Sequence, residues 1–268
     1  MEIGDIIIVT DLDGTVVPIT GKVSQKNLDA IKKFREKGGT FTIATGRSPF
    51  SAKEYCSILQ VNSYFIANNG ATIFDMKSNK TVWCQYLDSS YKNIVIDVKE
   101  KFDYVGIQAI TEDDIYHILV EYNCGDDFVR DKNFPYNDIC DSQLPDNCCK
   151  VLFQIDNEHF EEFTKYMNEQ NYDMFNFVKS GGECFEMMAK NISKGYPLEK
   201  IAELYGKNID NIATIGDFYN DIEMIKKAKI GCAVNNAPQE VKNIADIVVA
   251  SCEEDGLAEF IEYLINKF

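Results

Sequence analysis

Two aspartates near the beginning of the chain have the spacing of a catalytic or metal-binding pair. They lie in the segment Asp11-Leu12-Asp13-Gly14-Thr15, which follows a short apolar run. Residues two apart in an extended chain project to the same face, so the carboxylates of Asp11 and Asp13 point into one space. Two nearby carboxylates repel each other, which raises one pKa unless a cation neutralises them. The pair therefore indicates either an acid–base couple or a site for a hard metal ion.

A second acidic cluster, Gly216-Asp217-Phe218-Tyr219-Asn220-Asp221, also follows an apolar run. One acidic segment alone would fit a simple turn after a strand, and the second cluster favours a shared site instead. Mg²⁺ prefers oxygen ligands, commonly one or two carboxylates together with substrate phosphate oxygens. Asp11, Asp217 and a backbone carbonyl fit that pattern. Asp221 is interpreted as a residue that orients the ligands, as the N-cap of a helix starting near Ile222, or as both.

Two further segments offer groups suited to binding phosphate. Thr45-Gly46 ends another apolar run and provides a hydroxyl and backbone N–H groups. Arg47, the next residue, could contact the substrate, and a surface or helix-capping role is equally compatible with its position. Lys194-Gly195 places a flexible cation just before an expected helix, whose N-terminus favours anions.

Five short, β-rich apolar runs each lead into a polar or glycine-containing segment. They are residues 6–9, 41–44, 64–67, 212–215 and 230–234. Near-continuous apolar runs are typical of parallel strands that are covered on both faces. Between them, helical spacing appears in residues 28–34 and 198–205, and Ser48-Pro49 has the form of a helix start. The pattern predicts a doubly wound, Rossmann-like α/β sheet, with ligands at the carboxyl ends of its strands.

The segment from about Trp83 to Lys190 has a different pattern, with acidic, irregular stretches and no comparable strand-to-polar junctions. A strand is predicted at 151–155 and a helix at 160–167. We therefore expect an α+β domain at residues 84–190, inserted into an α/β core formed by residues 1–83 and 191–268.

Composition argues against several classes of function. The chain has 268 residues, with 27 Lys and Arg against 43 Asp and Glu and a formal net charge of −16. Such a negative surface repels phosphate backbones and anionic lipids, so neither nucleic-acid nor membrane binding is expected. No apolar stretch approaches the roughly 18 residues needed to span a bilayer, and no signal peptide is recognisable. We expect a cytoplasmic protein whose nine cysteines are reduced thiols.

Taken in order along the chain, these segments resemble the motifs of the haloacid dehalogenase superfamily of phosphatases, in particular the Cof-type branch with a large C2-type cap. Asp11 to Thr15 resembles the first motif, Thr45 the second, Lys194 the third, and Gly216 to Asp221 the fourth. The supporting stretches are Thr45-Gly46-Arg47, Asn68-Asn69-Gly70-Ala71, Asn236-Ala237-Pro238 and Glu254-Asp255-Gly256. The cap region resembles the family only in its length and placement.

The resemblance implies a Mg²⁺-dependent phosphatase for small phosphomonoesters, such as sugar phosphates or phosphorylated cofactors. Asp11 would attack phosphorus to form an aspartyl-phosphate, and Asp13 would act as general acid and then as base. Mg²⁺ would be held by Asp11, the main-chain carbonyl of Asp13, and Asp217. The phosphoryl oxygens would be bound by Thr45, Gly46, Lys194, Asn220 and the amide of Leu12. The oligomeric state is left open.

One departure from the family pattern is Phe218-Tyr219, where a small or polar residue usually comes first. Its bulk would narrow the entrance or stack on a substrate ring.

Three alternatives remain beside the main interpretation. The segment Cys124 to Arg130 fits the C-x5-R pattern of cysteine-dependent phosphatases, although Asp126 and Asp127 would repel an anion there. A phosphoacceptor domain without turnover and a phosphomutase on the same core are the other two.

Overall fold

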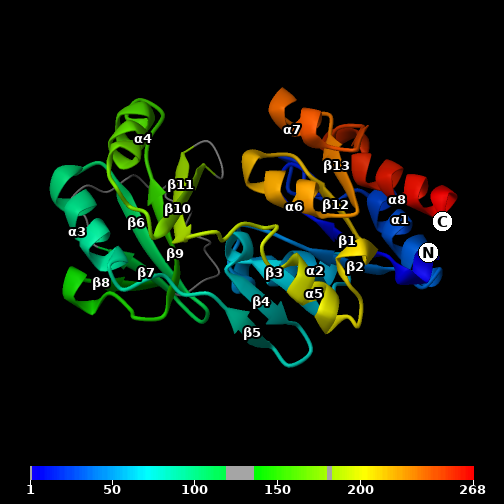
Figure 1. Ribbon diagram of the computed structural model, residues 1–268, viewed down its shortest axis with the longest axis horizontal. Coiled ribbons are helices and arrows are strands. Elements are labelled where there is room, and N and C mark those ends of the chain that lie inside the picture. The colour runs from blue at the N-terminus through cyan, green and yellow to red at the C-terminus, as the bar shows by residue number, and fades with distance from the viewer. Residues whose placement is uncertain (1, 119–135, 180–182) are drawn as a thin grey trace.

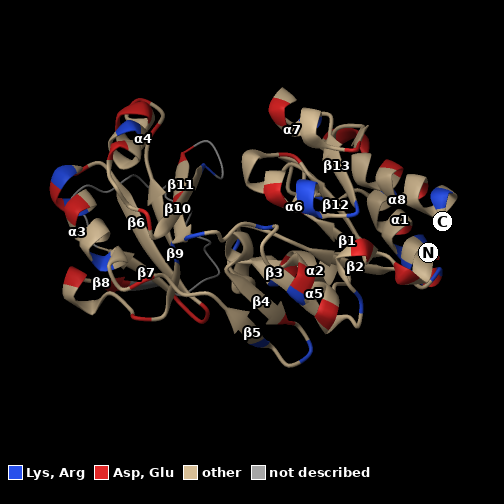
Figure 2. Cartoon of the chain, in the orientation of Figure 1, with Lys and Arg blue, Asp and Glu red and all other residues tan. Residues whose placement is uncertain are grey.

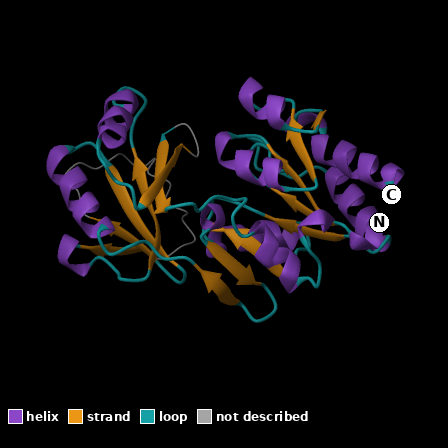
Figure 3. Cartoon of the chain, viewed as in Figure 1, coloured by secondary structure: helices purple, strands orange, loops and turns teal. Residues whose placement is uncertain are grey.

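The computed structural model describes residues 2–118, 136–179 and 183–268, and it forms two parts (Figure 1). The larger part contains both termini, and the smaller part is built from the middle of the chain. Each part is organised around its own sheet, and a small third sheet belongs to the larger part (Figure 3). Short 3-10 helices occupy Ile3–Asp5, Asn68–Gly70, Asp141–Gln143, Ile209–Asn211, Tyr219–Asp221 and Cys252–Glu254.

The central sheet of the larger part is wholly parallel and has the strand order β14-β13-β12-β1-β2. Its strands are β1 (Ile7–Thr10), β2 (Thr40–Ile43), β12 (Ile212–Gly216), β13 (Ile230–Val234) and β14 (Ile247–Val249). The chain runs outward from β1 to β2 on one side and from β12 to β14 on the other. The point where the order reverses therefore lies between β1 and β12, which is where open α/β sheets bind their ligands.

Helices cover both faces of this sheet. They are α1 (Gln25–Glu36), α2 (Pro49–Ile58) and α8 (Gly256–Lys267) on one face, and α5 (Leu198–Leu204), α6 (Ile222–Lys227) and α7 (Gln239–Ile244) on the other. Successive residues of β1 alternate between these layers, since Ile8 packs with α1 and α8 whereas Ile7 and Val9 pack with α5. The predicted doubly wound fold is thus confirmed. Ser48 caps α2 as expected, its hydroxyl accepting a hydrogen bond from the Ser51 N–H.

Two strands differ from the expectation. The run 64–67 forms β3 (Tyr64–Ala67), which pairs antiparallel with β4 (Thr72–Asp75), and β5 (Lys80–Cys84) completes this separate sheet. A single bridge between Ala44 and Ile66 joins β3 to the end of β2. Asn68 and Asn69 both have positive φ and reverse the chain directly after β3, so the nearest partner is β4. The edge strand β14 is only three residues long and was not predicted.

The smaller part is a six-stranded sheet backed by two helices. Its strand order is β10-β11-β9-β6-β7-β8, and neighbours are antiparallel except for the parallel pair β7 and β8. The elements are α3 (Tyr91–Lys101), β6 (Gly106–Thr111), β7 (Ile115–Ile118), β8 (Tyr136–Ile139), β9 (Cys148–Gln154), α4 (Phe160–Glu169), β10 (Phe175–Lys179) and β11 (Cys184–Ala189). The strand predicted at 151–155 and the helix at 160–167 are confirmed by β9 and α4.

One face of this second sheet packs on its helices and the other turns toward the larger part. Along β6, Ile107 and Ala109 join the core beneath α3 and α4. The alternate residues Gln108 and Ile110 line a cavity instead. This alternation follows from the two-residue repeat of a strand. The second sheet therefore presents a wall of side chains to the edge of the central sheet.

Acidic residues occur on helices of both parts of the molecule (Figure 2), in keeping with the net charge of −16. Within the residues that the structure describes, no helix combines the length and apolar character needed to cross a membrane.

Candidate active site

A cavity of about 930 Å³ lies between the two parts, at the carboxyl ends of β1, β2 and β12. Of the ten residues proposed from the sequence for catalysis, metal binding or phosphate and substrate contacts, seven line it, namely Asp11, Asp13, Gly46, Arg47, Lys194, Asp217 and Asn220. The remaining three are buried: Thr45 and Asp221 contact lining residues, and the Leu12 side chain packs in the core. The fold thus brings segments from both ends of the chain to one place.

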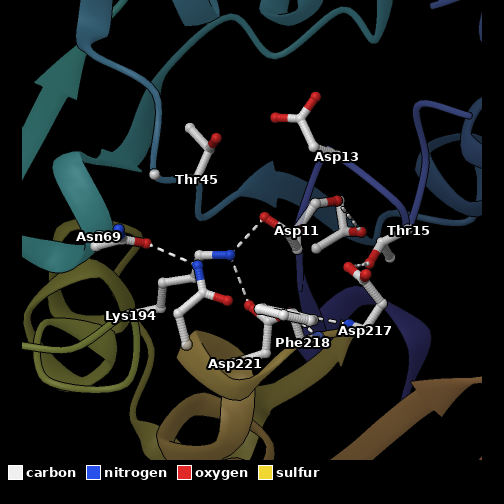
Figure 4. A network of polar contacts seen from close by, with 12 residues as sticks. Asp11, Asp13, Thr15, Thr45, Asn69, Lys194, Asp217, Phe218 and Asp221 are labelled. Carbon is white, nitrogen blue, oxygen red and sulfur yellow. Dashed lines mark hydrogen bonds and ion pairs between the residues drawn. The ribbon is translucent and has the colours of Figure 1, made fainter. Parts of the chain in front are cut away.

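Lys194 is held between two carboxylates at the base of this cavity (Figure 4). Its Nζ lies 2.6 Å from Asp11 Oδ1 and 2.6 Å from Asp221 Oδ1, and the side chain is 1% exposed. Burial lowers the pKa of Lys194, but attraction to Asp11 and Asp221 outweighs it, so the pKa is raised. Burial raises the pKa of Asp11 well above its usual range, and Lys194 opposes that shift. The lysine therefore compensates charge that the fold has removed from water.

Asp217 completes a cluster of carboxylates. Oxygens of Asp11, Asp217 and Asp221 all lie within 4.8 Å of one another. The Thr15 hydroxyl donates a 2.8 Å hydrogen bond to Asp217 Oδ1 and fixes its orientation. Burial, followed by repulsion from Asp221, raises the pKa of Asp217 to about 6. Asp11 and Asp217 thus converge on one space, as the sequence predicted.

Gly14 allows this convergence. Its φ is +84°, and a Cβ at this position would lie 2.5 Å from Asp217 Oδ2. Any larger residue would be strained and would displace the carboxylate. The turn after β1 and the Asp217 side chain are therefore packed directly against each other.

The Asp221 side chain orients the cluster and makes no capping bond to α6. Its Oδ2 accepts hydrogen bonds from the N–H groups of Asp217 and Phe218, at 2.9 and 3.0 Å, while Oδ1 binds Lys194. The helix α6 does begin at Ile222, but the Asp221 side chain makes no capping bond to it. Since both oxygens are already engaged, Asp221 is a poorer candidate for a metal ligand than Asp11 or Asp217.

Asp13 has a different environment from the other carboxylates. Its side chain is 53% exposed and forms a two-pronged ion pair with Arg47. Arg47 Nη2 lies 2.6 Å from Asp13 Oδ1, and Nε lies 2.8 Å from Oδ2. The guanidinium also lies over the Tyr55 ring, 4.7 Å from its centroid, and the hydrogen bonds to Asp13 raise the pKa of Arg47. The sequence did not predict this pairing of Arg47 with Asp13.

The Thr45 loop offers fewer free groups than expected. The Thr45 N–H donates to the Ile66 carbonyl at 3.0 Å, and the Thr45 carbonyl accepts from the Asn69 N–H. The Arg47 N–H donates to Thr45 Oγ1 at 3.1 Å, which leaves the hydroxyl proton free to be donated. Among the described residues, the N–H groups of Gly46 and Leu12 have no hydrogen-bond acceptor. The hydroxyl of Thr45 and the N–H of Gly46 are therefore the donors that this loop provides.

Three buried residues near the site were not assigned a role from the sequence: Asn69, Lys150 and Glu186. Lys150 and Glu186 line the same cavity from β9 and β11. They are 3% and 4% exposed and form an ion pair of 3.0 Å. The sequence does contain a signal for Lys150 and Glu186, because each is the single charged residue in an otherwise apolar strand. The two strands are Cys148-Cys149-Lys150-Val151-Leu152 and Cys184-Phe185-Glu186-Met187.

The second sheet also contributes apolar side chains to the cavity lining, beside polar ones such as Gln108 and Lys179. Ile110, Ile115 and Leu152 line it from β6, β7 and β9, and Phe218 lines it from the core. Phe218 thus faces the cavity, as its bulk suggested. Tyr219 packs edge to face against Phe218, with centroids 5.0 Å apart, and borders a neighbouring cavity of about 590 Å³.

The cysteine alternative cannot be placed, because Cys124 to Arg130 lies outside the described residues. The eight cysteines within the described ranges have free thiols, as expected. Burial raises the pKa of the thiols of Cys56, Cys148 and Cys252 to about 12, which makes them poor nucleophiles.

The fold and the site together define an α/β protein with three carboxylates and one lysine at the point where the strand order of its sheet reverses, covered by a second sheet. The family model of the haloacid dehalogenase-like hydrolases matches residues 8–261. The chain belongs to this family, which confirms the resemblance drawn from its motifs.

Curated relatives match along nearly the whole chain. Two from Bacillus subtilis (strain 168) are named 5-amino-6-(5-phospho-D-ribitylamino)uracil phosphatase. YitU is 26% identical, over 98% of this chain and 98% of its own length. YcsE is 29% identical, over 97% of this chain and 95% of its own length. These relatives confirm the predicted enzyme class, a phosphatase.

A solved structure supports the fold as a whole. A haloacid dehalogenase-like hydrolase from Bacteroides thetaiotaomicron superposes with a TM-score of 0.82. It is 24% identical, and the match covers 97% of this chain and 99% of the other. Both parts of the molecule therefore have counterparts in one known structure.

Proposed function

We propose that the protein hydrolyses small phosphomonoesters with the help of Mg²⁺, through an aspartyl-phosphate on Asp11. The observation that carries this proposal is the convergence of Asp11, Asp217 and Lys194 at the base of a cavity large enough for a small substrate. An anionic nucleophile attacks an anionic ester only where positive charge offsets their repulsion. Lys194 supplies part of that charge, and a divalent cation would supply the rest.

The residues present fit Mg²⁺. Three carboxylates face a single lysine, so the cluster carries an excess of negative charge, and all its potential ligands are oxygens. Asp11 and Asp217 would hold the ion together with the main-chain carbonyl of Asp13. Bound there, the ion would neutralise charge on the phosphoryl oxygens as a Lewis acid.

The other residues of the site bind and orient the phosphoryl group in this proposal. Lys194, the Thr45 hydroxyl and the N–H groups of Leu12 and Gly46 would donate to its oxygens, as would Asn220. Lys194 holds one oxygen of Asp11, and the second oxygen would attack phosphorus. Asp13 would protonate the departing alkoxide and afterwards take a proton from water.

Replacing Asp13 with asparagine is expected to lower kcat by about 10²–10⁴-fold, the usual contribution of a general acid–base group. Binding of Mg²⁺ should be nearly unchanged, because the proposed ligand is the main-chain carbonyl. Steady-state kinetics and calorimetric titration with Mg²⁺ measure the two quantities. An unaltered kcat would remove Asp13 from the mechanism, whereas lost Mg²⁺ binding would show that its carboxylate is a ligand.

We propose further that residues 84–190 form a mobile cap on a core of residues 1–83 and 191–268. The proposal is supported by the ends of two strands, since β5 ends at Cys84 and β11 ends at Ala189, each close to a proposed boundary. A cap that closes over the cavity would exclude bulk water and contact the leaving group. The apolar part of its lining and Phe218 suit a substrate with an apolar or ring-bearing portion, such as a phosphorylated cofactor, beside simple sugar phosphates.

A panel of phosphomonoesters tests the proposal directly. It contains hexose phosphates, pyridoxal phosphate, flavin mononucleotide and the ribitylaminouracil phosphate for which the Bacillus relatives are named. Release of inorganic phosphate is expected with Mg²⁺ and should disappear with a chelator. Since protonation of Asp217 competes with the ion, the affinity for Mg²⁺ should weaken as the pH falls through about 6. Chelator-resistant activity that thiol alkylation abolishes would favour the cysteine alternative instead.

The two remaining alternatives differ in the fate of the phosphoryl group. A phosphoacceptor domain would accumulate a stable aspartyl-phosphate without turnover. A phosphomutase would move the group to another hydroxyl of the sugar, and product analysis would find the isomer in place of free phosphate.

A further inference from the structure

A buried ion pair from the second sheet reaches across to the proposed phosphate-binding residues. Lys150 on β9 and Glu186 on β11 are diagonal neighbours in the sheet, since Lys150 pairs with Met188 and Glu186 with Leu152, and Lys150 Nζ lies 3.0 Å from Glu186 Oε1. Neither side chain is more than 6% exposed. Removing two charges from water is costly, and the cost is offset only where further hydrogen bonds satisfy both groups. The other hydrogen-bond partners of Lys150 and Glu186 therefore indicate which residues the ion pair positions.

Each member of the pair binds one residue of the core. Lys150 Nζ donates a 2.7 Å hydrogen bond to the Gly46 carbonyl. Glu186 Oε2 accepts a hydrogen bond from Asn69 Nδ2. Asn69, only 1% exposed, uses its Oδ1 to accept a 3.0 Å bond from Asn220 Nδ2. One continuous chain of polar contacts thus runs from the Thr45 loop, through the second sheet, to Asn220.

The contact with Gly46 acts on a single peptide group. The carbonyl that Lys150 binds belongs to the peptide whose N–H is that of Arg47, and this N–H donates to Thr45 Oγ1. Fixing this peptide therefore fixes the direction of the Thr45 hydroxyl and the turn that presents the Gly46 N–H. At the other end of the chain, Asn69 fixes the amide of Asn220. Both proposed phosphate-binding elements are oriented by the same ion pair.

We propose that Lys150 is a positioning residue for phosphate binding, with Glu186 as its counter-ion, and that the second sheet must be seated on the core for this binding site to be complete. The inference rests on the proposed function and deepens it. It gives the second sheet a part in the phosphoryl-binding site as well as in contacts to the leaving group. A misplacement of about 1 Å in such a loop lowers the rate by roughly 100-fold.

The test replaces Lys150 with methionine, which keeps the length of the side chain and removes its charge and donors. A second variant, Lys150→Met with Glu186→Leu, removes the whole pair and avoids leaving a buried carboxylate unpaired. Lys150→Arg retains a cation and donors. The matched control is Lys99→Met on α3, which loses an ion pair of 2.7 Å to Asp141 far from the cavity. For each variant, kcat, KM, the inhibition constant of inorganic phosphate and the thermal midpoint are measured with Mg²⁺.

Lys150→Met and the double variant should lose about 100-fold in kcat/KM and bind inorganic phosphate more weakly. Lys150→Met should also have a lower thermal midpoint, because Glu186 stays buried without its cation, whereas the double variant should fold as stably as Lys99→Met. Lys150→Arg should recover part of both losses, and Lys99→Met should resemble the wild type. Phosphate inhibition equal to that of the wild type, in folded Lys150→Met and double variants, overturns the proposal whatever the change in kcat. If the wild type hydrolyses nothing in the panel, the proposed function fails separately, and calorimetric titration with phosphate still decides the role of Lys150.

Discussion

Replacing Asp11 with asparagine is expected to abolish turnover, with kcat falling by roughly 10⁴-fold or more, as when other covalent nucleophiles are removed. The amide is a poor nucleophile and cannot form the acyl-phosphate bond. It also weakens the contact with Lys194 Nζ, which lies 2.6 Å from Asp11 Oδ1 in the wild type. The measurement is phosphate release at saturating substrate, with rapid quenching to trap the phosphorylated enzyme. Wild-type protein should give a trapped, acid-stable phosphoryl group, and the variant should give none.

The control for this experiment is Asp29→Asn, which makes the same change on an exposed residue of α1 whose carboxylate accepts a hydrogen bond from Gln25. It should have wild-type kinetics. Phosphate release by Asp11→Asn at the wild-type rate would refute the assignment of the nucleophile, and with it the proposed mechanism. A phosphoryl group trapped on the wild type without any release would identify the phosphoacceptor alternative.

Replacing Lys194 with methionine is expected to affect both stability and catalysis. The change leaves Asp11 and Asp221 buried without their cation, and breaking a buried pair in this way costs about 3–5 kcal/mol of unfolding free energy. Loss of one positioned donor to the developing charge lowers kcat by a further factor of about 10²–10³. Urea unfolding and steady-state kinetics measure the two effects. Because Mg²⁺ would restore positive charge beside the same carboxylates, the loss of stability should be smaller when the ion is present.

Lys227→Met provides the comparison for Lys194. Lys227 is partly exposed and pairs with Glu199 at 3.4 Å, so its loss should change stability by less than about 1 kcal/mol. A Lys194→Met variant that is as stable as Lys227→Met, with or without Mg²⁺, would show that the acidic cluster does not depend on this lysine.

Much of the site could be predicted from the sequence because its signals are local. Each strand that carries a functional loop is a short apolar run, and the residue that follows the run emerges at the carboxyl edge of the sheet. Asp11 after β1 and Asp217 after β12 are placed by that rule alone, and the register of Ile7 with Ile212 brings them together. The close approach of Gly14 to Asp217, by contrast, was not predicted, because it depends on how the two segments pack.

The parts that were missed depend on pairings between distant segments. The run 64–67 has the same composition as the central strands, and only the reversal at Asn68 and Asn69 assigns it to another sheet. The Thr45 N–H was expected to be free, yet that separate strand supplies its acceptor, the Ile66 carbonyl. The ion pair between Arg47 and Asp13 could not be predicted from the sequence. A charged residue in a loop can be exposed to solvent or paired with a distant residue, and its sequence neighbours do not distinguish the two.

The order of strands in the central sheet also affects how the chain can fold during translation. β1 is synthesised first, but its neighbour β12 lies in the last quarter of the chain, and the bond from Thr15 to Asp217 spans 202 positions. The six-stranded sheet pairs only strands that lie between residues 106 and 189. During translation, the inserted sheet can therefore form while β1 still lacks one of its two partners. The nascent chain must keep the strongly apolar β1 from aggregating until β12 has left the ribosome.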